Sequence, residues 1–542
     1  MKIRLIVISI VVFGLSSLLG GVLGDRVQRM EEQERAALKQ FTEILSVLEK
    51  NFPEDTDSKE LIEGAIRGAL RRLDPHSSYL DSKSYKAMRE EQKGSFSGLG
   101  IVVTKKGDHL TVISPIEGTP AYRMGIRAGD IISHIEGEQT ESLSLDEAVN
   151  RLKGKKGTKV NIHIKRFNVQ KPIPMSIVRD DIPTKSITKS FMMTKDIGYI
   201  RIKNFTRTTS DELEETVEDL IRQGMKKLVL DLRLNPGGLL EQAVKVTSQF
   251  LDRGQVVVGT RGRTRESNNI YRGENGAKMR SKPLIVLVNR ASASASEILA
   301  GAVQDHDRGL VIGEITWGKG LVQSVFPLRY DSGLALTTAR YYTPSGRSIQ
   351  RDYTSWEDYY DPEHLEMEES LDIEEEDAVR TDTGRPVYGG GGIRPDIILK
   401  QEPLSPVLER LFEKDLFFKY SVQYTAKHPE LKRHFNIADE YLDEFRNLAL
   451  EQGVEFKDED WKENLSEIAL RVKWQVSAAK LWQEDTYQIE AEMDTVLKEA
   501  IKYFPQAEEL MNQAASLVAE GKGKPDEPIP DAEAKKDFIK IP

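Results

Sequence analysis

Two short segments of the chain carry side chains that could perform nucleophilic catalysis. Residues 289–297 (NRASASASE) contain three candidate nucleophiles, Ser292, Ser294 and Ser296, at the expected start of an Ala-rich helix. Residues 316–323 (TWGKGLVQ) place Lys319 between two glycines. A serine hydroxyl is a poor nucleophile until a base removes its proton, and a lysine can be that base in the absence of a histidine. The two segments together predict a Ser-Lys hydrolase.

The surroundings of the lysine matter because a lysine with an ordinary pKa of about 10.4 is protonated at neutral pH. Burial or a nearby positive field must lower that pKa to roughly 7–8, which costs about 3–4 kcal/mol. Gly318 and Gly320 allow the backbone to turn Lys319 inward, away from water. Gln323 follows on the same face of an expected strand. Its neutral amide can orient the amine. A carboxylate at this position would instead stabilise the charged form of the amine.

Attack on a carbonyl also requires two N–H donors for the developing oxyanion. We expect one to be the backbone N–H of Ala295, where the dipole of the predicted helix 295–305 favours negative charge. The other candidate is the turn Asn235–Gly238 (NPGG), whose glycines let the backbone approach a substrate. A competing triad through His306 is disfavoured, because this residue lies at the far end of the same helix, about 18 Å from Ser294.

Residues 95–182 have the pattern of a small β-rich domain. Strands are expected at 100–103, 109–113, 131–135 and 160–164, with helical pieces at 121–124 and 145–152. The loop Gly98-Leu99-Gly100, which precedes Ile101, and the segment 120–132 (PAYRMGIRAGDII) resemble a PDZ domain. In such a domain the loop N–H groups bind the terminal carboxylate of a peptide, and the adjoining strand edge pairs with the peptide backbone. The alternative is a PDZ domain that only packs internally.

Residues 183–402 alternate strands and helices, which predicts an α/β core with largely parallel strand pairing. The expected strands are 198–202, 227–232, 284–288, 310–313 and 321–327, and the expected helices are 210–223, 239–252 and 295–305. An acidic stretch at 353–390 interrupts this pattern and predicts a mobile surface insertion. The four glycines 389–392 are expected to end it flexibly.

Both ends of the chain have a different character. Lys2 and Arg4 precede an apolar run at 5–23, so residues 1–24 are expected to be a cleaved signal peptide or a retained membrane anchor. Helical spacing predicts a helical region at 25–94 and a helical extension at 403–520. That extension either packs on its own chain or serves as a dimerisation or adaptor-docking module. Residues 521–542 are expected to be a disordered tail.

Composition excludes several classes of function. The chain has 542 residues, 39% hydrophobic and 30% charged, which suits several domains with polar surfaces. Its net charge of −10 argues against nucleic acid as the main partner. No cysteine is present, which excludes disulfides, thiol catalysis and cysteine–metal sites. We expect no cofactor and no metal.

Four segments carry a resemblance to a known family. SASASE, GKGLVQ, DLRLNPGG and YYTPSGRSIQ, together with the preceding PDZ-like region, resemble the carboxy-terminal processing proteases, also called tail-specific proteases. The resemblance implies a multidomain α/β protein with a crotonase-like protease core, an inserted PDZ domain and helical regions at both ends. It also implies that the PDZ domain binds substrate C-termini and can gate the active site.

The resemblance assigns roles to residues of this chain. It makes Ser294 the nucleophile, Lys319 the general base, Gln323 its amide partner and Gly238 the oxyanion donor beside Ala295. Glu297 also matches, although a helix-capping role would suffice for it. The acidic insertion and the region beyond residue 403 are not part of the minimal family pattern.

The expected function is therefore an exported endopeptidase, located in the periplasm or outside the cytoplasm, that acts on polypeptides with free C-termini. Two alternatives stay open. One is a non-enzymatic scaffold or holdase built on the PDZ domain and the helices. The other is a crotonase-like acyl-CoA enzyme, which the export segment and the PDZ domain disfavour.

Overall fold

The computed structural model describes residues 34–274, 279–353, 355, 359–361, 378–435, 437 and 439–520. The expected signal peptide or anchor at 1–24 and the expected tail at 521–542 lie outside these residues. The chain forms two compact units, residues 1–79 and 80–542. No helix among the described residues is both long and apolar enough to cross a membrane.

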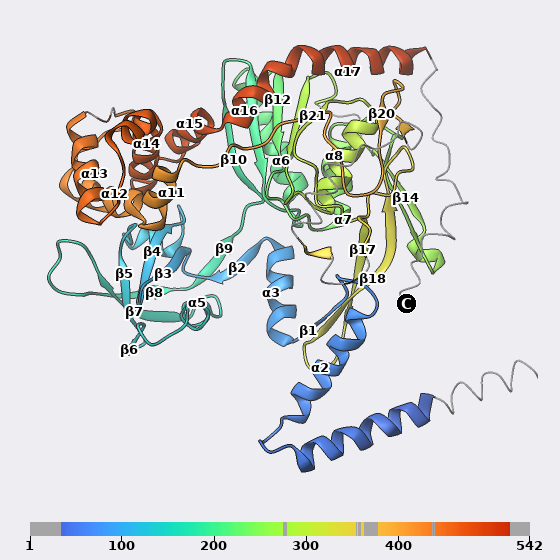
Figure 1. The fold of residues 1–542 in the computed structure, drawn as a ribbon, viewed down its shortest axis with the longest axis horizontal. Helices are drawn as coiled ribbons and strands as arrows, with labels where there is room; N and C mark the ends of the chain where they lie inside the picture. Colours follow the sequence, from blue (N-terminus) through green and yellow to red (C-terminus); the bar gives the residue numbers. More distant parts are fainter. Residues whose placement is uncertain are drawn as a thin grey trace, which may run out of the picture. The chain divides into compact units, whose positions relative to one another are not determined.

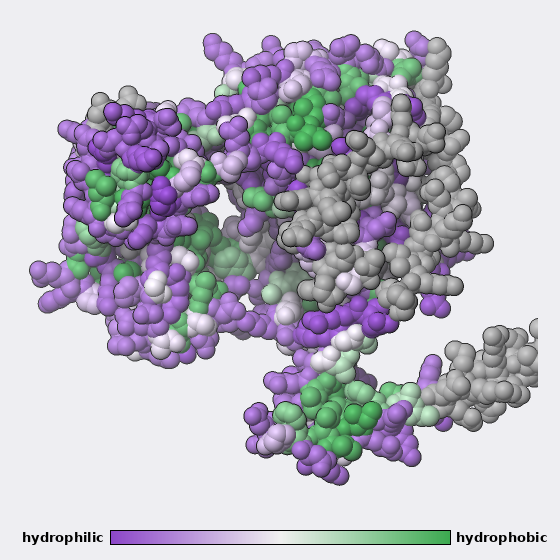
Figure 2. Space-filling model, in the orientation of Figure 1, coloured by the Kyte–Doolittle hydropathy of each residue, from purple (hydrophilic) through white to green (hydrophobic). Residues whose placement is uncertain are grey.

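The first unit is helical, as the sequence predicts. Residues 34–51 form one helix, and α2 (Ser58–Arg71) begins after Asp57, which caps it by accepting a hydrogen bond from the Lys59 N–H. Strand β1 (Ser78–Leu80) lies at the boundary between the units. Figure 2 shows apolar side chains gathered on these helices. Large apolar residues of this unit are exposed, among them Leu38, Phe41, Ile44 and Ile62.

The PDZ region is a six-stranded sheet in the order β3-β4-β5-β7-β8, with β6 paired to β5 (Figure 1). Its strands are β3 (Ile101–Lys106), β4 (His109–Pro115), β5 (Ile131–Ile135), β6 (Glu138–Gln139), β7 (Lys159–Lys165) and β8 (Ile173–Val178). Two helices, α4 (Pro120–Arg123) and α5 (Leu145–Leu152), complete it. Strand β3 is an edge strand of this sheet and contacts α5. An edge strand beside a helix is the arrangement that accepts an added peptide strand.

A short antiparallel ribbon joins this region to the core. Strand β2 (Ser95–Gly98) pairs with β9 (Asp180–Pro183), so the chain enters and leaves the PDZ sheet side by side. Helix α3 (Ser82–Lys93) precedes the ribbon and ends at Gly94, which has a left-handed conformation. The strand predicted at 100–103 is present as the start of β3, which begins at Ile101. Gly98, in the loop that was expected to open this strand, is the last residue of β2.

The core is built on a second six-stranded sheet, β10-β11-β12-β15-β16-β21. Strands β11 (Ile197–Ile202), β12 (Lys227–Asp231), β15 (Leu284–Val288), β16 (Leu310–Gly313) and β21 (Ile397–Ile398) are parallel, and β10 (Ile187–Met192) is antiparallel to β11. Successive residues of a strand face opposite sides of a sheet. Strand β15 (LIVLV) is apolar throughout because both of its faces are buried.

One face of this sheet packs against α6 (Thr209–Arg222), α7 (Leu240–Ser248) and α8 (Ala295–Asp305). The contacting residues of β12 are Leu228 and Leu230. A second, antiparallel group of strands lies beside these helices: β13 (Val256–Gly262), β14 (Asn269–Arg272), β17 (Leu321–Pro327) and β18 (Gly333–Tyr342). The predicted class, multidomain α/β with an inserted PDZ domain and helices at both ends, is confirmed.

The opposite face of the core sheet is covered by the end of the chain. Val229 and Ile285 point to this side and pack with Leu497, Ala500 and Phe504. These last three residues belong to α16 (Thr495–Ala500) and to the start of α17 (Phe504–Ala519). Helix α15 (Gln483–Met493) precedes them, and we call α15 to α17 the C-terminal arm. The arm is part of the core's packing.

Four further helices form a separate cluster. They are α11 (Pro406–Glu413), α12 (Leu416–Lys427), α13 (Asp439–Glu451) and α14 (Asp458–Ala479), and their core includes Leu411, Phe445 and Ile468. Within the predicted helical extension 403–520, apolar residues recur at helical spacing as one stripe from 465 to 517. The structure divides that stripe between two cores, because Ile468 packs in the cluster and Ala500 packs on the sheet.

The flanks of the acidic insertion are more ordered than its composition predicts. Strands β19 (Val379–Arg380) and β20 (Pro386–Val387) form a small hairpin, and Tyr359 is fully buried. Two of the glycines 389–392 are closely packed, since a side chain would lie 2.9 Å from the Ser348 carbonyl at Gly389 and 2.5 Å from the Thr316 carbonyl at Gly392, whereas Gly390 has open space around it. The flexible end expected at these glycines stays a prediction. The middle of the insertion, at 362–377, lies outside the described residues.

Candidate active site

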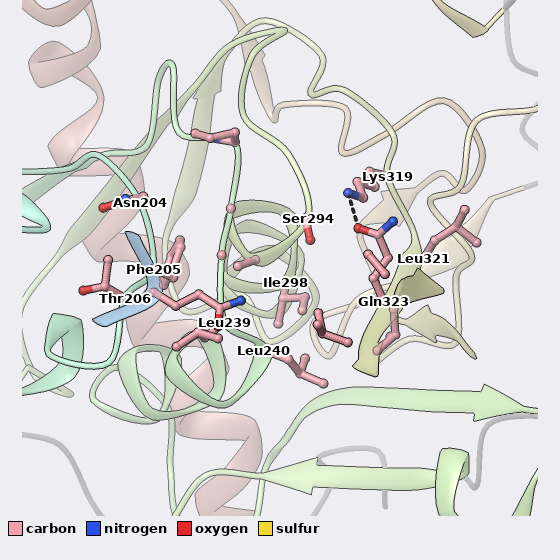
Figure 3. Close-up of a pocket in the computed structure, with 18 of the residues that line it drawn as sticks. Asn204, Phe205, Thr206, Leu239, Leu240, Ser294, Ile298, Lys319, Leu321 and Gln323 are labelled. Carbon is pink, nitrogen blue, oxygen red and sulfur yellow. Dashed lines mark hydrogen bonds between the residues drawn. The ribbon is translucent and has the colours of Figure 1, made fainter. Parts of the chain in front are cut away.

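The structure distinguishes the three candidate serines. The Ser292 hydroxyl donates to the Leu232 carbonyl (2.8 Å) and the Ser296 hydroxyl donates to the Asn235 carbonyl (3.0 Å). Both side chains are fully buried and serve the fold. Ser294 instead lines a pocket of about 360 Å³ (Figure 3). Of the three, Ser294 is therefore placed to meet a substrate.

Ser294 also has an unusual backbone. Its φ is 56° and its ψ is −111°, directly before the first residue of α8. A non-glycine residue with this conformation costs roughly 1–3 kcal/mol and persists only where the surrounding structure holds it. A strained turn from strand to helix is a common way to present a nucleophilic hydroxyl.

The pocket also contains the predicted lysine and glutamine. The Lys319 amine donates to Oε1 of Gln323 across 3.0 Å, as the dashed line in Figure 3 shows. No hydrogen bond between the Ser294 hydroxyl and the Lys319 amine is present in the described part of the chain. Hydrogen bonds between catalytic groups are often longer without substrate and tighten when it binds.

The glycines beside Lys319 are required by close packing. A side chain on Gly320 would lie 2.9 Å from the backbone nitrogen of Gln350, and Gly318 has a φ of 86°. Lys319 precedes strand β17, and the register of the β17–β18 pair shifts between Val322 and Gln323. The prediction that Lys319 and Gln323 share one side is therefore confirmed, although a regular strand does not produce it.

Glu297 joins the serine segment to the lysine segment. Its carboxylate is fully buried and accepts hydrogen bonds from four donors. Oε2 accepts from the N–H groups of Ser294 (2.6 Å) and Lys319 (3.0 Å). Oε1 accepts from the Thr316 hydroxyl (2.6 Å) and the Gly318 N–H (2.7 Å). Burial raises the pKa of the Glu297 carboxyl, and these hydrogen bonds oppose the rise.

The sequence assigned Glu297 only a capping role. Its cap to Ser294 is present, but three of its four hydrogen bonds reach the segment 316–319, on the far side of the site. Tyr341 makes a second link that the sequence did not predict. Its hydroxyl lies 3.1 Å from the Ser294 carbonyl and within hydrogen-bond distance of the Lys319 carbonyl. Burial raises the pKa of the Tyr341 hydroxyl, which keeps it a donor.

The predicted oxyanion turn lies beside the serine. A side chain on Gly237 would lie 2.8 Å from Cβ of Ser294, so only glycine fits there. Gly238 forms a parallel bridge with Phe205 and has a φ of 147°. Among the residues that the structure describes, the N–H groups of Gly238 and Ala295 have no acceptor. Two unpaired N–H groups beside a nucleophile can stabilise an oxyanion.

Asn235 fixes this turn and was not singled out from the sequence. Its side-chain NH₂ donates to the Ile202 carbonyl and its Oδ1 accepts from the Gly237 N–H, both across 2.9 Å. Its own carbonyl accepts from the Ala293 N–H and the Ser296 hydroxyl, both across 3.0 Å. The signal that could have identified it is its position in the NPGG turn, directly before the two glycines.

The apolar side of the pocket would contact the substrate. It is lined by Leu239, Leu240, Ile298, Leu321, Val325 and Ala335. Helix α3 contributes Met88, Glu91 and Gln92 to the rim. The pocket is therefore suited to an apolar side chain next to the carbonyl that is attacked.

The PDZ loop residues Gly98, Leu99, Gly100 and Ile101 do not line this pocket. They form the predicted loop at the start of β3. The Leu99 carbonyl accepts from the Ala121 N–H (3.0 Å) and the Gly100 carbonyl from the Ile116 N–H (2.9 Å). Gly100 has a φ of 79°, and a side chain there would lie 2.3 Å from Cβ of Thr119. Only glycine fits this position.

His306 has no part in the pocket. It follows α8, where Nδ1 lies 2.8 Å from Asp382 and Nε2 lies 2.8 Å from the Val256 carbonyl. Burial alone would lower the pKa of His306, but the carboxylate of Asp382 raises it. Within the described residues, no cluster of three or more His, Cys, Asp or Glu side chains could hold a metal ion.

Comparison with known proteins agrees with this geometry. Residues 196–355 match peptidase family S41, residues 111–166 match the PDZ domain, and residues 23–84 match the activating protease CtpB N-terminal domain. The carboxy-terminal-processing protease of Bartonella bacilliformis is 45% identical over 324 residues, which are 59% of this chain and 74% of that protein.

Two further proteins are similar. The carboxy-terminal processing protease CtpA of Bacillus subtilis is 35% identical over 347 residues, 64% of this chain and 72% of that protein. Among solved structures, the photosystem II D1 C-terminal processing protease is 29% identical and covers 68% of this chain and 89% of its own, with a TM-score of 0.36. The chain therefore belongs to the carboxy-terminal processing proteases of peptidase family S41 and is a serine peptidase with a PDZ domain.

Proposed function

We propose that this peptidase is exported from the cytoplasm, captures the C-terminal end of a polypeptide in its PDZ domain and cleaves the chain through an acyl-enzyme. The observation that carries the mechanism is the pocket in which Ser294, the Lys319–Gln323 pair and two unpaired N–H groups meet. Export is supported by Lys2, Arg4 and the apolar run that follows them.

In the proposed reaction, Oγ of Ser294 attacks the carbonyl carbon of the scissile peptide bond while Nζ of Lys319 takes the hydroxyl proton. The N–H groups of Gly238 and Ala295 donate to the oxyanion of the tetrahedral intermediate. When the C–N bond breaks, the Lys319 ammonium gives its proton to the leaving amine. A water molecule then attacks the ester carbonyl and transfers a proton to Lys319. The C–O bond to Ser294 breaks, Lys319 returns the proton to Oγ, and the new C-terminal end of the peptide leaves as a carboxylic acid. Gln323 orients the amine throughout.

Recognition of a free C-terminus is tested with two peptides that differ only in a terminal carboxylate or a terminal amide. Hydrogen bonds to a charged group contribute about 1.5–3 kcal/mol, so amidation should lower kcat/KM by roughly tenfold to a hundredfold. The measurement is cleavage of both peptides, with mass spectrometry to locate the cut.

Gly100→Ala is the matched variant, because it distorts the PDZ loop and leaves the catalytic pocket unchanged. This variant should cleave both peptides at the slow rate at which the unmodified protein cleaves the amidated peptide. Equal cleavage of the two peptides by the unmodified protein would show that the PDZ loop does not read the terminal carboxylate.

Glu297→Gln should lower kcat about a hundredfold. An amide NH₂ would replace one carboxylate oxygen and face at least one backbone N–H donor, which leaves buried polar groups unsatisfied at a cost of about 1–3 kcal/mol each. The segments that carry Ser294 and Lys319 would then separate. Kinetics and thermal unfolding are measured together.

Thr316→Val is the milder companion of Glu297→Gln, because it removes one donor and keeps the carboxylate. We expect it to retain most of the activity. A Glu297→Gln enzyme with unchanged kcat would show that the buried carboxylate does not align the two segments.

A further inference from the structure

An ion pair joins the C-terminal arm to the loop that precedes the oxyanion turn. Asp494, between α15 and α16, accepts two hydrogen bonds from the Arg233 guanidinium, from Nη1 across 3.2 Å and from Nη2 across 2.6 Å. Arg233 lies in the loop that leads from β12 to Gly238. The side chains of both partners are mostly buried, with exposed fractions of 14% for Arg233 and 17% for Asp494.

Arg233 is also fixed from the side of the core. The carboxylate of Asp231, at the end of β12, is fully buried and accepts from the Arg233 backbone N–H (2.9 Å), Nε (3.0 Å) and Nη2 (2.7 Å). The Tyr199 hydroxyl donates to the same carboxylate across 2.6 Å. Burial would raise the pKa of Asp231, but Arg233 overcomes this and lowers it. The guanidinium is thus held between two carboxylates, one from the core and one from the arm.

The next residue along the chain needs this support. Leu234 has a φ of 60°, a conformation that is unfavourable for a branched side chain, and its N–H donates to Oδ1 of Asn289 (2.9 Å). Arg233 fixes the chain before this strained residue, and Asn235 fixes it after. The position of the turn that ends at Gly238 therefore depends on both anchors.

We propose that Asp494 is a positioning residue for the oxyanion turn, so that the C-terminal arm completes the active site as well as covering the sheet. The proposal rests on the proposed function, because it assumes that Gly238 donates to the oxyanion. Without the carboxylate of Asp494, Nη2 of Arg233 would lose the acceptor Oδ2, and the charge that holds the guanidinium from the arm would be absent. The guanidinium would then turn toward solvent and relax the strained loop.

The test uses Asp494→Asn in the full-length protein. Asp494 also caps α16, since Oδ1 accepts from the Leu497 N–H across 2.8 Å, and asparagine preserves this cap. Removal of one oxyanion donor lowers kcat by about 10²–10³-fold. In Asp494→Asn the turn is displaced but Asn235 still holds it, so we expect kcat to fall less, by roughly tenfold. KM for a peptide substrate should not change, because the loss is confined to the transition state.

A second readout separates this role from general destabilisation. A peptide aldehyde forms a tetrahedral adduct with a serine nucleophile and so probes the oxyanion site directly. Its affinity should fall by the same factor as kcat, while binding of a free C-terminal peptide to the PDZ domain stays constant. Asp494→Glu keeps the charge and should recover part of the loss.

Tyr487→Phe is the matched control. Tyr487 lies on the same arm, and its hydroxyl donates to the Thr188 carbonyl across 2.9 Å, away from the loop of Arg233. Its kcat should equal that of the unmodified protein. If Asp494→Asn does not fold, Asp494→Ser, which also keeps a capping side chain, is measured in its place.

The proposal is overturned if the Asp494 variant keeps its kcat and its aldehyde affinity, or if Tyr487→Phe loses as much. Ser294→Ala distinguishes this outcome from failure of the proposed function. If Ser294→Ala is inactive and Asp494→Asn is fully active, only the role of the arm is wrong. If Ser294→Ala still cleaves, Ser294 is not the nucleophile, and the proposed function, including its oxyanion site, is wrong.

Discussion

Ser294→Ala is expected to abolish peptide cleavage and to leave the fold and peptide binding intact. The substitution removes the only side-chain oxygen of the three candidate serines that lines the pocket. Alanine carries the same backbone strain at φ 56°, so thermal unfolding should change little. The measurement is cleavage of a peptide with a free C-terminus, together with the affinity of the inactive variant for that peptide.

Ser292→Ala is the control for Ser294→Ala. It removes a buried hydroxyl that donates to the Leu232 carbonyl, and it should lower stability by about 1–3 kcal/mol while cleavage persists. If Ser292→Ala were inactive at full stability while Ser294→Ala cleaved normally, the nucleophile would have to be reassigned.

Lys319→Arg is expected to lower kcat by about 10⁴-fold or more, as the loss of a general base does in other serine hydrolases. An arginine can still donate to Gln323, but it is permanently charged, because it cannot lose its proton at any working pH. The variant therefore separates proton transfer from simple electrostatic attraction. Single-turnover kinetics should show that acylation itself is lost.

Gln323→Glu is the companion of Lys319→Arg. A carboxylate 3.0 Å from the amine would stabilise the ammonium form and raise its pKa, so the rise of activity with pH should move toward alkaline values. Appreciable activity in Lys319→Arg, or an unchanged pH profile in Gln323→Glu, would contradict the role of an uncharged amine.

Much of the scaffold was predictable because its elements have regular periodicity. Helix α5 occupies the predicted residues 145–152, and β15 occupies the predicted residues 284–288. The prediction failed where a helix with an apolar face could pack against either of two different cores. The apolar positions of 465–517 indicate which helix faces are buried, but not that Ile468 packs in a helical cluster and Ala500 on a sheet.

The site itself was predictable in part. The residue types of two recognisable segments predicted a Ser-Lys pair with Gln323, but they left Ser292, Ser294 and Ser296 open, and the family resemblance selected Ser294. Tyr341 lies in another segment, and only the folded chain shows that it contacts the Ser294 carbonyl. The same holds for Asp494 and its contact with Arg233. Composition alone could not show that Gly392 is required by close packing, because a run of glycines can mean close packing as well as conformational freedom.

The strained backbone at Ser294 affects which substitutions this position can accept during evolution. Glycine adopts a φ of 56° without penalty, so a glycine at this position would give a sturdier molecule with no enzymatic activity. Selection for stability therefore favours glycine at this position, whereas selection for catalytic activity favours serine. A pseudoenzyme derived from this lineage would most readily carry its first substitution at the nucleophile itself.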